Sequence, residues 1–305
     1  MRVAIVHDWL TGMRGGEHVL EGLLDLLPEA EIFTLLHVPG TVSARIEARP
    51  IHVSFIDRLP DVARRYRYYL PLFPRAVESL SLSGFDLVVS SSHCVAKGAR
   101  APSGVPHVCY CHTPMRYVWD QYEAYFGPGR ATPGVRFAMR YMAPRLRAWD
   151  VRTARRVTRF VANSQHVRRR IGTFYGREAS VVHPPVDVEG FGPRGRRGDH
   201  YVVLGAPAPY KRLDLAVEAF RLIDRPLWVV GEGVGAGAVS GRNGPASHRR
   251  TDRKQVPRLV LKSPAHLFGQ AARTGHRALA DVKQLVNHAH RRLLHNLVGR
   301  VINLP

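Results

Sequence analysis

The sequence predicts an α/β protein whose strands form parallel sheets with helices on both faces. Short apolar runs alternate with stretches of helical periodicity from the first residue onward. The run at 2–7 is typical of a buried strand, and the apolar residues of 17–27 repeat at helical spacing as far as Pro28. Further strand-like runs lie at 31–36, 51–56, 85–91, 106–112 and 159–164. Strands that alternate with helices in this way favour a parallel sheet covered on both sides.

A change in composition near residue 185 predicts a linker between two domains. Residues 186–200 are rich in Pro, Gly and Arg. The alternation restarts at 201–233, where a strand, a helix at 211–223 and a second strand make another βαβ unit. We therefore expect a complete Rossmann-like domain at 1–185 and the start of a second one at 201–233.

The last quarter of the chain differs in composition from the rest. Residues 234–305 contain 13 Lys and Arg, two acids, one Phe and no Glu, Tyr or Trp. Such a segment buries little core, so we expect an irregular, poorly ordered basic tail. Only 277–298 has the spacing of an amphipathic helix. The abundance of Arg, His, Gly, Ala and Pro is typical of an altered reading frame, which predicts a second domain truncated or frameshifted after residue 233. The alternative is a tail that evolved with this composition.

The net charge narrows the classes of partner. The chain of 305 residues is 45% hydrophobic and 23% charged, as in ordinary globular proteins, but carries a net charge of +21. Nucleic acid, an anionic membrane or a phosphorylated substrate would each suit that charge. About half of the excess lies in the tail and no nucleic-acid-binding motif occurs, so nucleic acid is not an expected partner. No apolar run reaches the roughly 18–20 residues that span a bilayer, and no signal peptide is evident, which predicts a cytoplasmic protein.

The three cysteines predict reduced thiols rather than disulfides. They are Cys94, Cys109 and Cys111, and so few cysteines fit a reducing compartment. Cys109 and Cys111 lie two apart in a predicted strand and therefore face the same side. Metal binding would need more ligands at suitable spacing, so we predict buried thiols and no metal site.

Two segments are candidates for phosphate binding. Gly12, Gly15 and Gly16 lie between the first strand and a helix, where close backbone approach and the helix N-terminus favour an anion. Their spacing departs from the G-x-G-x-x-G dinucleotide pattern, which argues against NAD. Lys211 and Arg212 begin a helix, where cations oppose the helix dipole and so indicate a ligand. The structural alternatives are ordinary turn geometry and a solvated helix start.

A third candidate is His112, which ends a predicted strand. Open α/β sheets bind ligands at the carboxyl ends of their strands. The surrounding segment CHTPMRYVWDQY places several polar and aromatic residues around this histidine. A single histidine is weak evidence for a site, but this setting favours a functional role.

Together these segments resemble bacterial family 4 (group 1) glycosyltransferases of the GT-B fold, in particular the mannosyltransferase-like branch of polysaccharide assembly. The matching motifs span 1–233 in order: VHDWL with GGEHVLEGL, SSSHCVAKG, CHTPMRYVWDQY, ANSQHVRRRI, YGREASVVHPPVDVEGF, and APYKRLDLAVEAF with WVVGEG. The resemblance implies a nucleotide-diphosphate sugar donor, GDP-mannose in this branch, and a saccharide or lipid-linked acceptor. It also implies transfer of the hexose with retention of configuration, without a metal or other cofactor.

The resemblance implies a role for each matching position. His112 and Lys211 would be catalytic, with His112 near the donor sugar and Lys211 stabilising the departing nucleoside diphosphate. The residues that bind the donor and its phosphates would be Gly15, Gly16, Lys211, Arg212 and Glu232. The residues on the cleft and acceptor side would be Asp8, Arg116, Asn163 and Ser164.

The sequence also departs from the family pattern. Ala206 stands where the commoner pattern has an arginine, and no glutamate follows Glu232. The acidic E-x7-E segment that holds the donor sugar in such enzymes is therefore missing, and we expect little or no transfer. A noncatalytic remnant that binds a partner, or a basic protein that binds nucleic acid or anionic surfaces, is the alternative.

One further segment is a candidate for membrane contact. Residues 64–75, RRYRYYLPLFPR, interleave arginine with Tyr, Leu and Phe. On a helix this pattern would suit an anionic membrane interface, such as the inner face of the plasma membrane. The alternative is an ordinary surface helix with one partly buried face.

Overall fold

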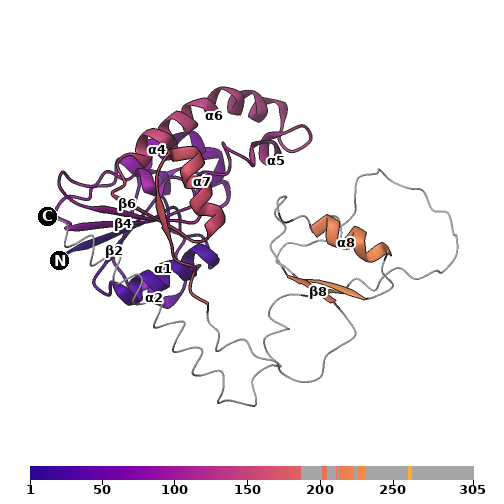
Figure 1. Ribbon diagram of the computed structural model, residues 1–305, viewed down its shortest axis with the longest axis horizontal. Coiled ribbons are helices and arrows are strands. Elements are labelled where there is room, and N and C mark those ends of the chain that lie inside the picture. The colour runs from indigo at the N-terminus through magenta and orange to yellow at the C-terminus, as the bar shows by residue number, and fades with distance from the viewer. Residues whose placement is uncertain (187–200, 205–210, 212, 223–225, 231–259, 263–305) are drawn as a thin grey trace, which may run out of the picture. The chain divides into compact units, whose positions relative to one another are not determined.

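The computed structural model describes residues 1–186, 201–204, 211, 213–222, 226–230 and 260–262. The chain divides near residue 187 into two compact units. Figure 1 shows strands and helices in the first unit, and strands with the helix α8 in the second. The division falls at the start of the segment expected to be the linker.

The first unit is built on a seven-stranded sheet in which every strand pairing is parallel. The strands are β1 (Val3–His7), β2 (Glu31–Thr34), β3 (Ile51–Val53), β4 (Leu87–Ser92), β5 (His107–Cys111), β6 (Arg159–Ala162) and β7 (Ala179–Val181). Their order is β3-β2-β1-β4-β5-β6-β7, so the direction of winding reverses between β1 and β4. Sheets of this topology bind ligands beyond the carboxyl ends of the strands at such a reversal. The predicted α/β fold with parallel strands is confirmed.

Helices cover both faces of this sheet. They are α1 (Gly15–Leu26), α2 (Ala44–Glu47), α3 (Val62–Arg65), α4 (Phe73–Glu78), α5 (Tyr122–Phe126), α6 (Pro133–Ala154) and α7 (Gln165–Tyr175). Short 3-10 helices are η1 (Phe55–Arg58), η2 (Tyr66–Leu72) and η3 (Ala96–Gly98). In Figure 1, α1 and α2 lie on one side of the sheet, and α4, α6 and α7 lie on the other.

Alternation along β1 shows how the two faces are filled. Val3 and Ile5 belong to the cluster that contains the apolar face of α1, whereas Ala4 and Val6 belong to the cluster under α4 and α6. All four side chains are buried, because a strand between two helical layers has no solvent-facing side. This explains why the first strand is an uninterrupted apolar run in the sequence.

The cysteines lie where the sequence predicted. All three are free and buried. Cys109 and Cys111 point to the same side of β5, into a cluster with the apolar face of α7. Burial raises the pKa of the Cys94 and Cys111 thiols well above the usual value, so these thiols stay protonated. Their role is packing.

The segment 64–75 does not form the single helix that the membrane hypothesis assumed. The chain passes from α3 through η2 into α4 within this segment, and Pro71 lies inside η2. Tyr66, Leu70 and Phe73 are buried in the core beside the sheet. The burial agrees with the alternative of a partly buried face. The 3-10 winding of η2 turns Tyr66 and Leu70 inward, and Phe73 is buried as the first residue of α4.

The second unit contains a smaller parallel sheet of order β10-β9-β8. Its elements are β8 (Tyr201–Leu204), α8 (Leu213–Leu222), β9 (Leu227–Val230) and β10 (Val260–Lys262). The sequence predicted the first three elements but ended the ordered domain at residue 233. A run as short as β10 carries little periodic signal, and it becomes a strand by pairing with β9. The amphipathic helix predicted at 277–298 lies outside the described residues.

None of the helices among the described residues is both long enough and apolar enough to cross a membrane.

Close packing between η3 and α6 gives a first prediction. A Cβ atom added to Gly98 would lie 2.4 Å from the ring of Trp149, which is buried. We therefore expect Gly98→Ala to lower the free energy of unfolding by about 2 kcal/mol, measured by chemical denaturation.

The matched control is Gly172→Ala on α7, where an added Cβ would meet no atom within 4 Å. Alanine favours helix over glycine, so this variant should gain about 0.5–1 kcal/mol. Equal stability of the two variants would contradict the packing of η3 against α6.

Candidate active site

Polar side chains gather where four neighbouring strands end. The pairing register sets His7 of β1 beside Ser91 of β4, and Cys111 of β5 beside Ser92 and Ala162. Because the strands are parallel, the residues that follow them meet at one edge of the sheet. The side chains at this edge are His7, Asp8, Ser91, His93, His112, Asn163 and Ser164.

His112 is held firmly at the end of β5. Its ring Nε2 lies 2.9 Å from the Ser91 hydroxyl oxygen. Its backbone N–H donates to the Ser92 carbonyl at 2.8 Å, and its carbonyl accepts from the Asn163 side-chain amide at 3.0 Å. Burial lowers the pKa of His112 to about 3, with His93 and His7 contributing in the same direction. The imidazole is therefore neutral at physiological pH.

Asn163 and Ser164 link β6 to α7 at the same edge. The Ser164 hydroxyl donates to the Asn163 side-chain oxygen at 3.0 Å. The same hydroxyl caps α7 by accepting the Val167 N–H at 3.2 Å. These bonds orient the Asn163 amide toward the His112 carbonyl, so the pair positions His112.

Asp8 organises the loop after β4. Its carboxylate accepts the backbone N–H groups of residues 93, 94, 95 and 96 at 2.6–2.9 Å. The His93 ring Nδ1 lies 3.0 Å from the same carboxylate. Although burial alone would raise the pKa of Asp8, His93 lowers it well below the usual range by its charge and hydrogen bonds. Asp8 has no exposed surface, and its contacts are with the loop that follows β4.

The glycines predicted to approach a donor begin α1. Gly15 and Gly16 are its first two residues, and their N–H groups lie at the positive end of the helix. A Cβ atom on Gly16 would lie 3.5 Å from Cε1 of His7 and 3.9 Å from Nε2 of His112. Gly16 therefore keeps the space beside both histidines free of a side chain.

Glu17 adds a negative charge to this end of α1. It is buried, and it accepts the Arg14 N–H at 2.9 Å. Although burial alone would raise the pKa of Glu17, the His7 ring, 3.7 Å away, lowers it below the usual value. An ionised carboxylate here opposes a second anion, so this end of the helix suits a hydroxyl-rich neutral ligand better than a phosphate.

A match to a family model decides which family this is. Residues 13–189, more than half of the chain, match the model described as Glycosyltransferase Family 4. The chain belongs to glycosyltransferase family 4. No curated protein matches the chain in sequence. The matched residues include every element of the first unit from α1 to β7.

Several solved structures are similar to this family 4 member. The apo form of the lipopolysaccharide outer core galactosyltransferase WaaB has a TM-score of 0.49 and 13% identity, over 88% of this chain and 71% of WaaB. Anabaena HepE in complex with UDP-glucose has a TM-score of 0.46 and 13% identity, over 77% of this chain and 62% of HepE. Acinetobacter baumannii MurG has a TM-score of 0.37 and 14% identity, over 86% of this chain and 67% of MurG. The chain thus spans 62–71% of these proteins' lengths.

Two histidines at the site of this family 4 member received no role from the sequence. His7 is buried, and neither of its ring nitrogens has a hydrogen-bond partner within the described part of the chain. His93 packs edge-on against Trp9, with ring centroids 4.4 Å apart. Both lie inside motifs that carried the resemblance, VHDWL and SSSHCVAKG. Their position at the ends of predicted strands could have identified them from the sequence.

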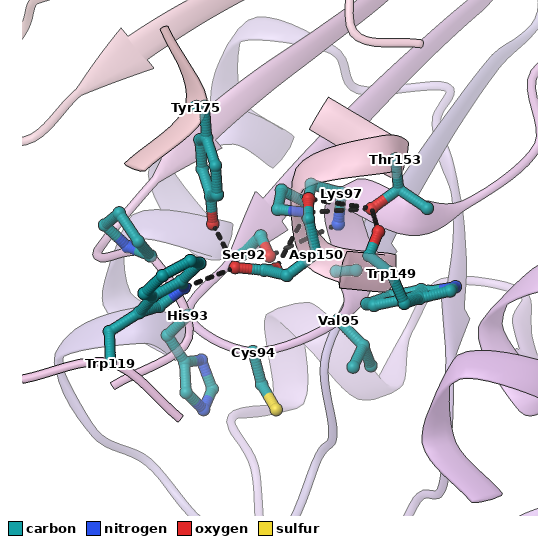
Figure 2. A network of polar contacts seen from close by, with 12 residues as sticks. Ser92, His93, Cys94, Val95, Lys97, Trp119, Trp149, Asp150, Thr153 and Tyr175 are labelled. Carbon is teal, nitrogen blue, oxygen red and sulfur yellow. Dashed lines mark hydrogen bonds and ion pairs between the residues drawn. The ribbon is translucent and has the colours of Figure 1, made fainter. Parts of the chain in front are cut away.

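A buried ion pair between Lys97 and Asp150 holds the loops that follow β4 and β5 (Figure 2). Lys97 Nζ lies 2.9 Å from an Asp150 carboxylate oxygen and donates to Thr153 at 2.9 Å. The other Asp150 oxygen accepts from Trp119 Nε1 at 2.8 Å and from the Tyr175 hydroxyl at 2.9 Å. This network joins the loop after β4 and the loop after His112 to α6 and α7.

The remaining predicted residues lie elsewhere. Arg116 is half-buried in the loop after β5. Lys211 is exposed just before α8 in the second unit, while Arg212 and Glu232 lie outside the described residues. Within the described residues, no group of three or more His, Cys, Asp or Glu side chains could hold a metal ion.

The four N–H bonds to Asp8 give a second prediction. Asp8→Asn replaces an acceptor-only carboxylate with an amide that also carries donors, leaving buried N–H groups unsatisfied. We expect the free energy of unfolding at pH 7 to fall by about 3 kcal/mol, while Asp25→Asn, an exposed partner of Arg45, should change it by about 0.5 kcal/mol or less.

The pH dependence of this difference follows from the depressed pKa of Asp8. A carboxyl whose folded pKa is lowered stabilises the fold above its unfolded pKa of about 3.9, and that contribution is lost as the pH falls further. The difference in the free energy of unfolding between Asp8→Asn and the wild type should therefore be constant from pH 7 to about pH 5 and shrink below pH 4. A gap that widens toward acid would contradict an ionised Asp8.

Proposed function

We propose that this chain is a nucleotide-sugar glycosyltransferase. The reaction would transfer a hexose from a nucleotide-diphosphate sugar to a saccharide or lipid-linked acceptor, with retention and without a metal. We expect this activity to be strongly impaired in this chain, because the acidic E-x7-E segment is missing. The observation that carries the proposal is the neutral, fixed imidazole of His112 beside Gly16 at the carboxyl edge of the first sheet. Membership of family 4 supports the reaction class.

His112 would contact the sugar that is transferred. A neutral imidazole can hydrogen-bond a sugar hydroxyl without bringing a charge into the reaction. Its ring and backbone are held by Ser91, Ser92 and Asn163, so little movement would be needed when the sugar binds. We therefore assign His112 to orienting the donor sugar for attack.

The end of α1 would face the acceptor. Gly15 and Gly16 offer N–H donors, while the ionised Glu17 makes this end of the helix less favourable for phosphate. Sugar hydroxyls both donate and accept hydrogen bonds, so they can use both groups. We therefore propose that the N-terminal end of α1 binds a neutral saccharide part of the acceptor.

Lys211 would bind the donor phosphates. It is exposed immediately before α8, and an ammonium there can neutralise the diphosphate that leaves. In this assignment Arg212 and Glu232 are further donor contacts. GDP-mannose is the donor we propose, because the motifs resemble the mannosyltransferase-like branch.

Donor binding gives a third prediction. We expect the full chain to bind GDP-mannose in calorimetry more tightly than UDP-glucose or UDP-galactose. Lys211→Ala should weaken that binding about tenfold, because a charge-assisted contact to phosphate is lost. Arg45→Ala removes one charge at an exposed site of the first unit and should leave the affinity unchanged.

His112→Ala separates chemistry from binding. It should leave donor affinity within about twofold while lowering the release of GDP from GDP-mannose about 100-fold. If none of these donors binds, the proposal is wrong and a noncatalytic protein is favoured. Equal affinities of Lys211→Ala and Arg45→Ala would remove Lys211 from the site.

A further inference from the structure

We propose that the outward face of α6 docks on an anionic lipid bilayer. We define the outer stripe of α6 as its exposed residues Arg136, Phe137, Arg140, Tyr141, Pro144 and Arg145. The inference extends the proposed function, since a lipid-linked acceptor is presented at a membrane surface. Its test uses neither donor nor acceptor, so the two proposals succeed or fail separately.

The outer stripe follows from how α6 packs. Met139, Ala143, Leu146 and Trp149 are buried against the sheet at spacings of three and four residues. On a helix with 3.6 residues per turn, these positions form one face. Phe137, Tyr141 and Pro144 fall on the opposite face. Arg136, Arg140 and Arg145 lie on its flanks, and all six are exposed.

Two large aromatic side chains are exposed together on this stripe. Phe137 is 65% exposed and Tyr141 is 55% exposed. They are one turn apart, with ring centroids 5.0 Å apart and the rings edge to face. Single exposed apolar side chains are common on protein surfaces. A pair of aromatic rings among arginines on one helix face is typical of helices that lie at a membrane interface.

In the sequence on either side of the two rings, every charged residue is positive. Residues 124–149 contain five arginines and no acidic residue. Arg136, Arg140 and Arg145 are exposed, and none pairs with an acid within the described residues. The first acid that follows, Asp150, is buried and paired with Lys97. Arginines at this spacing can reach lipid phosphates while the rings enter the interfacial layer.

The shape of the stripe favours a bilayer over nucleic acid. Proteins that bind single strands hold the backbone in a positively charged groove and stack bases on aromatic rings. The outer stripe is the convex side of one helix, and its two rings pack against each other. By comparison, the segment 64–75 buries Tyr66, Leu70 and Phe73 and exposes mainly Tyr68 among its aromatic residues.

A site-specific probe tests the inference. The full chain carrying Phe137→Cys is labelled with an environment-sensitive nitrobenzoxadiazole dye, because the three native thiols are buried. The same label on Glu29→Cys, an exposed position next to β2, serves as the matched control. With vesicles containing 30% phosphatidylglycerol at physiological salt, the emission at position 137 should rise and shift to shorter wavelength. The emission at position 29 should not change.

Charge-neutral variants separate docking by α6 from attraction through the net charge of +21. Phe137→Ser combined with Tyr141→Ser keeps every charge, and we expect it to lower flotation with these vesicles about tenfold. Tyr68→Ser, an exposed tyrosine in 64–75, is the matched control and should float like the wild type. Circular dichroism should show that each variant is folded.

The outcomes decide the inference in either direction. A responsive probe at position 137 with flotation lost only in the double variant supports it. A silent probe at position 137, or flotation that survives the double variant, overturns it. An equal loss in Tyr68→Ser also overturns it, as does a probe that responds to single-stranded DNA but not to vesicles.

Discussion

The candidate site depends on one buried carboxylate. Asp8 leaves the carboxyl end of β1 and accepts four successive backbone N–H groups of the loop after β4. Four backbone N–H donors point to one place only when the chain folds around an acceptor. The conformation of the loop therefore depends on the ionised carboxylate of Asp8. The loop starts beside Ser91 and Ser92, which hold His112. Asp8 thus fixes the site without being exposed to it.

A second buried charge extends this constraint to the helices. Lys97 ends the region held by Asp8 and pairs with Asp150 of α6, which also binds Trp119 and Tyr175. A buried pair of this kind gains stability only when all its partners are present, because a lone buried charge is costly. The loops after β4 and β5 are therefore tied to the same part of α6. The outward face of that helix is then free to serve another purpose.

The sequence predicted the fold better than the site. Alternating apolar runs located β1 to β6 and the second βαβ unit, because strands buried on both faces leave uninterrupted apolar segments. β7 and β10 escaped prediction, whereas β3, which is equally short, was found because its apolar run continues to Ile56. His112 was found from its place at a strand end. His7, His93 and the buried role of Asp8 were not, because they depend on side-chain contacts between residues about 85 positions apart.

The surface was the least predictable part. The composition of the arginine-rich segment 64–75 suggested membrane contact, yet three of its apolar side chains, in η2 and at the start of α4, are buried. The outer stripe of α6 was missed because aromatic residues occur on both of its faces, with Phe137 and Tyr141 exposed and Trp149 buried. Only the packing of Met139 and Trp149 shows which face is outward.

Hydrogen exchange at the amides of residues 93–96 tests the central claim most directly. These residues follow the end of β4, and an ordinary exposed loop exchanges its amide hydrogens rapidly. If the Asp8 carboxylate holds all four amides, they should exchange at pH 7 as slowly as the amides of β4. Exchange at the rate of an unprotected loop, with β4 still protected, would contradict the account.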